Sequence, residues 1–368
     1  MPAPASAAGG DGQRPERASE RLLRLDFECL ESLPGQLREV RTWLDNVTGG
    51  EFAGKRMDLS LLESEVLIEP QILQQITHDN VVPILSAARV DGYPSPMDVV
   101  EIVMPHHPRG SLTDAMLRGE RFSMREACQL IQAALRGLGE IHERHQVVHR
   151  DIKSSNLLLA DDHTLLKVGD LGLAGRMDPQ GRVAMIDNPQ LYSPPELVAD
   201  GYLTRQSDLF SLGLVFVELV REPFPYHSCT RTHIVSRLMP GVSPLRTVDR
   251  QLPPWVPRGL KRVITKATAR HPGQRYPTAR HMSAALANVR VIDWKQIADN
   301  RWEAPYLHQP DRRIAVESRT MRSGKIRLSV LAYRSAWRRA QPDTDVEDLY
   351  SADAAAVFDQ ADQIACAR

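Results

Sequence analysis

The groups most capable of chemistry stand together at residues 149–156, which read HRDIKSSN. Asp151 could accept a proton from a hydroxyl group, Lys153 could bind a phosphate as a point charge, and Asn156 could coordinate a hard cation. Phosphoryl transfer needs a group of each kind. A His-Arg-Asp tripeptide alone also fits a surface loop with a salt bridge, so other parts of the chain must decide between the two interpretations.

Apolar segments flank this polar cluster on both sides. Residues 146–148 read as a short buried strand, and three consecutive leucines follow at 157–159. A loop between two strands can carry catalytic side chains while the strands fix its ends. We therefore expect the cluster to lie on such a loop.

The composition is that of an ordinary globular protein. Hydrophobic residues make up 42% and charged residues 25% of the 368 residues, enough for one large domain or two. Lys+Arg and Asp+Glu both number 46, so any binding of nucleic acid or membrane must be local. The four cysteines lack metal-type spacing, which suits a reducing compartment.

The chain start has neither the basic nor the apolar segment of a signal peptide. The longest apolar run, 209–220, is too short to span a bilayer. We expect a cytoplasmic protein without membrane contact, with residues 1–20 as a disordered tail because they are rich in Ala, Gly, Pro and charge.

The first part of the chain reads as strands, and the second as helices. Apolar residues at three-and-four spacing over 127–141 predict an amphipathic helix, and 207–220 predicts a helix buried on every side. Pro70 should deform or restart the helix expected over 59–77. The other expected strands are 27–33, 39–44, 51–57, 81–85 and 99–104, and the other expected helices are 259–268 and 277–291.

Residues 293–368 form a distinct, locally basic module. Between positions 301 and 340 there are ten Arg or Lys residues against three acidic ones. We expect strands at 313–316 and 326–331 and a closing helix over 345–365. With Trp302, Tyr306, Tyr333 and Trp337, the module could bind nucleic acid. The favoured alternative is a small domain that packs on the helical part, with its aromatic residues in a core.

Further motifs accompany the polar cluster in a fixed order. Asp170-Leu171-Gly172 follows Asn156 by fourteen residues, and Lys55 ends an upstream strand after Ala53-Gly54. Downstream come Tyr192-Ser193-Pro194-Pro195-Glu196, then Asp208 and Arg275. With this set, residues 26 to 290 resemble the eukaryotic-type protein kinases.

The resemblance implies an α+β, bilobal protein-kinase fold. Residues 21–110 would form the β-rich N-lobe and 111–292 the helical C-lobe, followed by the small α+β module at 293–368. Glu196 with Arg275, and Asp208 beneath the catalytic loop, would be structural ties of the large lobe.

The resemblance also implies ATP and Mg²⁺ as cofactors and protein hydroxyls as substrates. Lys55 would hold the α- and β-phosphates, oriented by a glutamate of the helix, while Asp170 and Asn156 would hold magnesium. Asp151 would orient and deprotonate the attacking hydroxyl. Lys153 is similar to the serine/threonine-directed branch of the family.

The implied adenine pocket draws on both lobes. Met104 would guard it, and Pro105 to His107 would form the hinge whose backbone pairs with adenine. The adenine ring would lie between three apolar side chains: Val40, Ala53 and Leu158.

The sequence departs from the family pattern in the N-lobe. Only Gly35 remains of the glycines expected in the phosphate loop, so this segment also fits a plain hairpin, and Glu39 would repel phosphate. The helix glutamate is assigned to Glu69, although Pro70 disfavours helix there and Glu65 lies one turn earlier.

The activation segment, residues 173–191 of the C-lobe, departs from the family pattern as well. The branch usually places a threonine three residues before Tyr192, where this chain has Pro189. Residues 173–191 contain no Ser, Thr or Tyr. We therefore predict that phosphorylation of this activation segment does not switch activity.

Two functions remain open. The first is an active serine/threonine protein kinase, because Lys55, Asp151, Asn156 and Asp170 are all present. The alternative is a pseudokinase, a scaffold that binds nucleotide weakly or not at all. The sequence identifies neither the protein substrate nor the oligomeric state.

Overall fold

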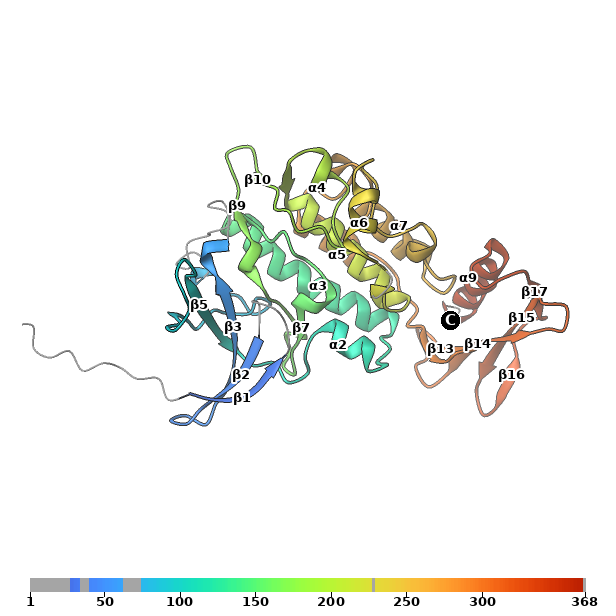
Figure 1. Cartoon of the computed structure of the whole chain (residues 1–368). Helices are drawn as coiled ribbons and strands as arrows, with labels where there is room; N and C mark the ends of the chain where they lie inside the picture. Colours follow the sequence, from blue (N-terminus) through green and yellow to red (C-terminus); the bar gives the residue numbers. More distant parts are fainter. Residues whose placement is uncertain (1–26, 34–39, 62–73, 227–228, 367–368) are drawn as a thin grey trace, which may run out of the picture.

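The computed structural model describes residues 27–33, 40–61, 74–226 and 229–366. A five-stranded antiparallel sheet in the order β1-β2-β3-β5-β4 forms the N-terminal part, at one end of the molecule (Figure 1). Its strands are β1 (Phe27–Leu33), β2 (Val40–Asp45), β3 (Glu51–Asp58), β4 (Ser86–Arg89) and β5 (Val99–Pro105).

The β2–β3 turn is built by side-chain hydrogen bonds. The carboxylate of Asp45 accepts from the backbone N–H of Val47 at 2.9 Å and from the hydroxyl of Thr48 at 2.6 Å. Gly49 has a φ of 70°, which a residue with a side chain rarely adopts. These contacts fix the register that opposes Val40 to Lys55.

The strand expected at 81–85 is wrong. Strand β4 occupies Ser86–Arg89, and Val81 forms only an isolated parallel bridge to Val168. The backbone N–H of Val82 donates to the carbonyl of Val168 at 2.9 Å, so this buried segment is bound to the C-lobe. The apolar run therefore joins the lobes instead of extending the sheet.

Two earlier expectations lie mostly outside the described residues. Of the helix expected over 59–77, residues 62–73 are not described; Leu59–Leu61 is a 3-10 turn. The tail at 1–20 is likewise outside the described part.

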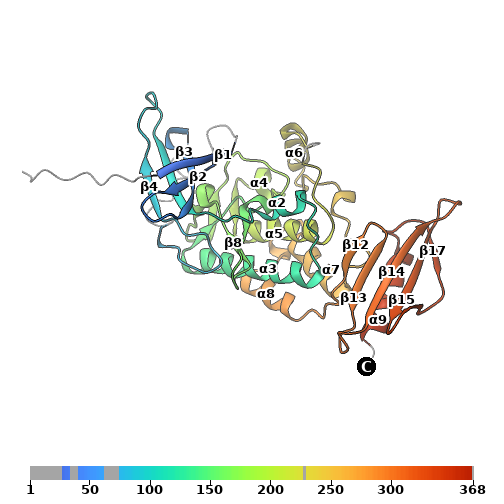
Figure 2. The ribbon, with the colours of Figure 1, turned by 90° about the horizontal axis from the view of Figure 1, so that it is seen from below.

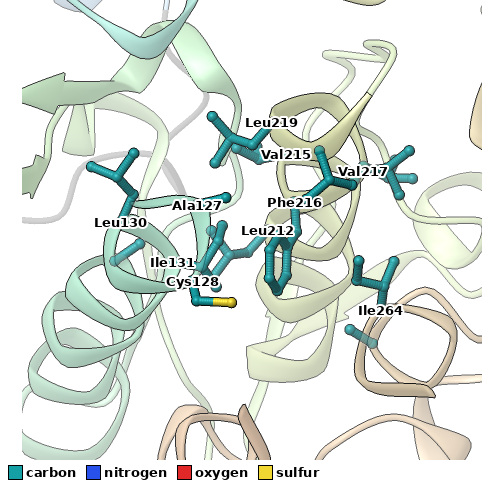
Figure 3. Packing of buried hydrophobic residues seen from close by; sticks show 14 of the residues in the cluster. Ala127, Cys128, Leu130, Ile131, Leu212, Val215, Phe216, Val217, Leu219 and Ile264 are labelled. Atoms are coloured by element: carbon teal, nitrogen blue, oxygen red, sulfur yellow. The ribbon is translucent and has the colours of Figure 1, made fainter. Parts of the chain in front are cut away.

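The C-lobe is helical and encloses the main core. Helix α3 (Met124–Gly139) begins at a capping box between Ser123 and Glu126, and α5 (Arg205–Val220) is buried along nearly its whole length. Figure 3 shows the two helices packing through Ile131 and Leu212. The other helices are α2 (Leu112–Leu117), α4 (Glu196–Ala199), α6 (Arg231–Leu238), α7 (Arg258–Ala267) and α8 (Ala279–Ala287).

Three two-stranded sheets complete this lobe. They pair β6 (Val147–Val148) with β9 (Gly175–Arg176), β7 (Leu157–Leu159) with β8 (Leu166–Val168), and β10 (Arg182–Ala184) with β11 (Tyr202–Thr204).

A six-stranded antiparallel sheet and helix α9 (Ala352–Cys366) form the C-terminal module at the opposite end of the molecule (Figure 2). The helix expected over 345–365 begins only at Ala352, because 344–346 pair with β15 as a strand. The strands are β12 (Lys295–Ala298), β13 (Arg301–Pro305), β14 (Arg313–Thr320), β15 (Ile326–Tyr333), β16 (Trp337–Arg339) and β17 (Thr344–Val346).

Aromatic side chains join the module to the C-lobe. Trp255 of the lobe lies 4.7 Å from Trp302 and 5.9 Å from Phe358 of the module, between ring centroids. Within the module, Trp294 packs edge-on against Phe358 at 5.5 Å and extends this cluster. Such aromatic pairs stabilise a contact by more than the burial of their area alone.

In the described part of the chain, no helix has the length and apolar character needed to cross a bilayer.

Candidate active site

The loop that carries Asp151 runs between β6 and β7, as the flanking apolar segments predict. The Asp151 side chain is nearly buried and receives bonds from its own loop. Lys153 Nζ lies 2.9 Å from its Oδ2, and Asn156 Nδ2 donates to Oδ2 at 3.0 Å and to the Asp151 carbonyl at 2.8 Å. The three side chains predicted from the sequence therefore meet in one cluster.

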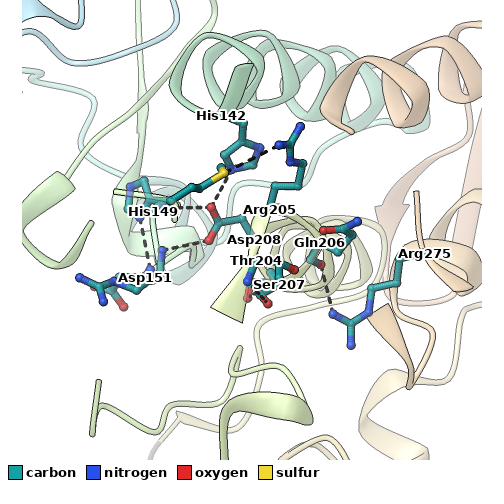
Figure 4. Close-up of polar contacts among 12 residues, drawn as sticks. His142, His149, Asp151, Thr204, Arg205, Gln206, Ser207, Asp208 and Arg275 are labelled. Carbon is teal, nitrogen blue, oxygen red and sulfur yellow. Dashed lines mark hydrogen bonds and ion pairs between the residues drawn. The ribbon is translucent and has the colours of Figure 1, made fainter. Parts of the chain in front are cut away.

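Helix α5 holds this loop in place through Asp208 (Figure 4). The buried Asp208 carboxylate accepts from the backbone N–H groups of His149 at 2.7 Å and Arg150 at 2.9 Å. Its Oδ2 also lies 2.7 Å from His142 Nε2. Asp208 thus occupies the structural position that the family resemblance implies.

The loop is also tied to the segment of Asp170. His149 Nε2 lies 2.8 Å from the carbonyl of Gly169, and the Gly169 N–H donates to the Asn156 carbonyl at 2.8 Å. Asp170 itself has a left-handed φ of 58°, which costs free energy in a residue with a side chain. The neighbouring bonds hold this conformation.

Lys55 from the N-lobe reaches Asp170 from the C-lobe. Its Nζ lies 2.5 Å from Asp170 Oδ1. Burial alone would raise the pKa of Asp170, but the charges of Lys55 and Lys153 outweigh it and hold the pKa at about 2. The carboxylate is therefore ionised throughout the physiological range.

The residues expected around adenine lie on neighbouring elements. Ala53 of β3 stands opposite Met104 of β5, and Leu158 is the central residue of β7. Met104 lines a small pocket together with Lys55 and Asp170.

The hinge follows this pair of strands. Pro105 ends β5, and His107 comes two residues later. Burial lowers the pKa of His107, and its Nε2 has no hydrogen-bond partner among the described residues. Gly35 and Glu69 lie outside the described residues, so their assigned roles stay predictions.

Arg150 binds the activation segment through three main-chain carbonyls. Its guanidinium donates to Leu173 at 2.6 Å, to Ala174 at 2.9 Å and to Ala184 at 2.8 Å. A Cβ on Gly175 would lie 2.7 Å from the guanidinium carbon, so only glycine leaves room for this arrangement. The three carbonyl groups therefore take up the hydrogen-bond donors of the Arg150 guanidinium, to which a phosphate on the activation segment would otherwise bind.

A cavity of about 450 Å³ opens beside the catalytic loop. The cavity is the candidate site for the substrate segment, because both Lys153 and the end of the activation segment line it. Its lining includes Thr113, Ser155, Pro189, Leu191 and Tyr226.

Gln190 is a site residue that sequence reasoning missed. Its Nε2 donates to Asp151 Oδ1 at 2.7 Å. No periodicity or motif of the sequence points to Gln190; the one signal is the absence of threonine at Pro189, one position earlier. Only the fold brings residue 190 against residue 151.

Comparisons with known proteins agree with this geometry. The protein kinase domain matches residues 34–286, which is more than half of the chain. The chain belongs to the protein kinase family. The ion pair between Glu196 and Arg275, 2.6 Å long and buried on both sides, is the structural tie of the kinase C-lobe that the resemblance implies.

Curated relatives of the chain are serine/threonine kinases by name. Serine/threonine-protein kinase PrkC of Bacillus subtilis is 28% identical over 61% of the chain, which covers 33% of that protein. The probable serine/threonine-protein kinase WNK9 of Oryza sativa is 28% identical over 57% of the chain and 51% of its own length. Aurora kinase C of Mus musculus is 27% identical over 59% and 73%. The chain thus spans a third to a half of several of these relatives.

Proposed function

We propose that the chain is an active serine/threonine protein kinase that transfers the γ-phosphate of Mg-ATP to protein hydroxyls. One observation carries this proposal: Lys55 of the N-lobe is joined to Asp170, and bonds through Gly169 and Asn156 connect Asp170 to Asp151. A charge for phosphate, a ligand for metal and a base for the hydroxyl are therefore held in one connected site.

The donor atoms suit magnesium. Asp170 offers an ionised carboxylate, and the amide nitrogen of Asn156 faces Asp151, which leaves the amide oxygen as its atom for a cation. Mg²⁺ is commonly bound by one or two side chains together with substrate phosphates. When bound, Mg²⁺ would neutralise charge on the phosphates.

The side chains of the chain perform the remaining tasks. Asp151 orients the substrate hydroxyl and accepts its proton, a role that contributes on the order of 10²–10⁴-fold. Lys55 binds the α- and β-phosphates, and Lys153, beside Asp151, offsets charge on the phosphoryl group in transfer. Met104 and the hinge residues Pro105 and His107 would bound the adenine.

Transfer of labelled γ-phosphate from Mg-ATP to a generic basic protein tests the proposal. We expect transfer by the wild type and loss of about 10²-fold or more in Asp151→Asn and Asp170→Asn. Wild-type transfer no greater than that of Asp151→Asn would contradict the proposal.

The pseudokinase alternative rests on the single glycine of segment 33–40 and on Pro70. A scaffold of this kind would show no thermal stabilisation by Mg-ATP, whereas a ligand at a hundred times its Kd adds about 2.7 kcal/mol to the free energy of unfolding.

The cytoplasmic location also stays a prediction.

Nucleic-acid binding by the module at 293–368 is the less favoured interpretation. Trp302 and Tyr306 are buried, and several arginines of the sheet are paired with acidic residues, such as Arg301 with Glu317 and Arg327 with Asp345. Salt-dependent binding of RNA or DNA by the full chain would reverse this preference.

A further inference from the structure

The catalytic carboxylate is held from two sides. Lys153 and Asn156 bind it from its own loop, whereas Gln190 reaches it from the end of the activation segment. A carboxylate only accepts hydrogen bonds, so the amide nitrogen of Gln190 faces it. The bond is 2.7 Å long, typical of a donor to an ionised acceptor.

Gln190 is the closest donor to one of the two carboxylate oxygens. Asp151 Oδ1 receives Gln190 at 2.7 Å and Lys153 at 3.2 Å, while Oδ2 receives Lys153 at 2.9 Å and Asn156 at 3.0 Å. Without Gln190, Oδ1 would keep only the longest of these contacts. The carboxylate plane would then be free to rotate away from the orientation that Gln190 and Asn156 define together.

The backbone of Gln190 is fixed in turn. Its N–H donates to Ser193 Oγ at 2.7 Å, and the Ser193 N–H donates back to the Gln190 carbonyl at 3.0 Å. Ser193 is 7% exposed and precedes two prolines, which restrict the chain further. The side-chain amide therefore starts from a rigid turn.

The same residue lines the candidate substrate cavity. Gln190 borders it together with Lys153 and Tyr226, so a bound substrate segment lies against the residue that orients the base. Pro189, one position earlier, has neither a hydroxyl nor an N–H to offer Asp151. The longer side chain of Gln190 supplies the donor that Pro189 lacks.

We propose that Gln190 is a positioning residue for phosphoryl transfer: its amide fixes the Asp151 carboxylate toward the hydroxyl of a substrate bound in the adjoining cavity. The inference rests on the proposed kinase function. It assigns a role in the chemical step to the substrate-facing end of the activation segment.

Gln190→Met tests the role, because methionine has a similar length but no donor. We expect kcat to fall about tenfold or more, the effect of one lost bond to a charged group, while KM for Mg-ATP stays within about twofold. Gln180→Met is the matched control, since Gln180 is exposed on the same segment. It should leave both constants unchanged.

Gln190→Glu gives a second reading should Gln190→Met fail to fold. It keeps the shape but opposes a second carboxylate to Asp151, so kcat should fall further. Wild-type kcat in a folded Gln190→Met or Gln190→Glu protein would overturn the proposal, and a rise in KM for Mg-ATP with unchanged kcat would do the same.

A measurement without turnover separates this inference from the kinase function. In protein labelled with ¹⁵N-glutamine, the side-chain amide resonance of Gln190 should shift when Asp151 is replaced by Ala. If the resonance shifts but the wild-type protein shows no phosphotransfer, the contact between Gln190 and Asp151 stands and only the kinase function is refuted. Active protein without the shift would overturn the role of Gln190.

Discussion

At the scale of residues, the site depends on two strained backbones. Arg150 and Asp170 have φ values of 65° and 58°, in a region that costs a residue with a side chain about 1–3 kcal/mol. Arg150 is held there by Asp208 on its N–H and by three carbonyls on its guanidinium. The strain is sustained because many contacts determine the same conformation.

Gly175→Ala should disrupt the contacts of Arg150 with the activation segment. The new Cβ would meet the guanidinium at 2.7 Å, and the three carbonyl bonds leave it little room to move. We expect activity to fall about tenfold and limited proteolysis to cut segment 173–191 faster. Gly273→Ala is the control, because a Cβ there meets nothing within 4 Å. Resistance to protease equal to that of the wild type would contradict the prediction.

The absence of Ser, Thr and Tyr from 173–191 leads to a second prediction at this scale. Because Arg150 already binds protein carbonyls, no phosphate is needed to order the segment. Active protein treated with a phosphatase should keep its rate within about twofold.

Ser193→Ala should lower kcat through Gln190, because Ser193 Oγ accepts the Gln190 N–H. Phosphatase treatment should not reproduce that loss.

At the scale of elements, helix α5 organises the C-lobe. It is buried along nearly its whole length, and its polar first turn presents Asp208 to the loop that carries Asp151. The apolar positions of α5 pack against α3 and α7, so the helix is fixed on several sides. The helix thereby places a carboxylate against the backbone of the loop, where it accepts from the N–H groups of His149 and Arg150.

Asp208→Ala should reduce the free energy of unfolding by about 3–5 kcal/mol, because it leaves two backbone N–H groups and His142 without their acceptor in the interior. Urea unfolding would measure the loss. Asp187→Ala is the control: it removes an exposed ion pair with Arg231 and should cost at most about 1 kcal/mol. Equal effects of the two substitutions would refute the role of α5.

At the scale of the whole molecule, the C-terminal module is joined to the kinase lobe by an aromatic and acidic junction. Arg258 of α7 pairs with Asp359 of α9 across this junction at 2.7 Å, and within the module Trp294 Nε1 donates to Asp362 of α9 at 2.6 Å. Burial raises the pKa of Asp362 to about 6. The module therefore carries a carboxylate that becomes protonated only below about pH 6.

Asp362→Asn should stabilise the protein at pH 8. The folded-state pKa of about 6 lies above the ordinary aspartate value of 3.8, so the ionised carboxylate opposes folding above pH 6, and this penalty disappears as pH falls below about 4. An asparagine side chain can still accept the Trp294 N–H through its amide oxygen, but it does not titrate. We expect a gain of about 1–3 kcal/mol at pH 8 that shrinks toward pH 4, measured by urea unfolding. A gain that is the same at both pH values would contradict this account.

The sequence by itself determined the family, and it predicted the loop that carries Asp151 and most of the helices. Asp151, Lys153 and Asn156 lie within six residues, so local spacing was enough to assign them to one site. Strong periodicity likewise predicted α3 and α5 nearly to their ends. Short apolar runs misled, since Val81 and Val82 bind the C-lobe and not the sheet.

Only the tertiary structure decided which distant groups meet. Lys55 and Asp170 are 115 positions apart, and Gln190 is 39 from Asp151, so no local pattern relates them. The module's place on the C-lobe depends on Trp255 and Trp302, whose rings pack because both elements bury an apolar face. Contacts of this kind follow from burial over the whole chain, which the order of residues does not show locally.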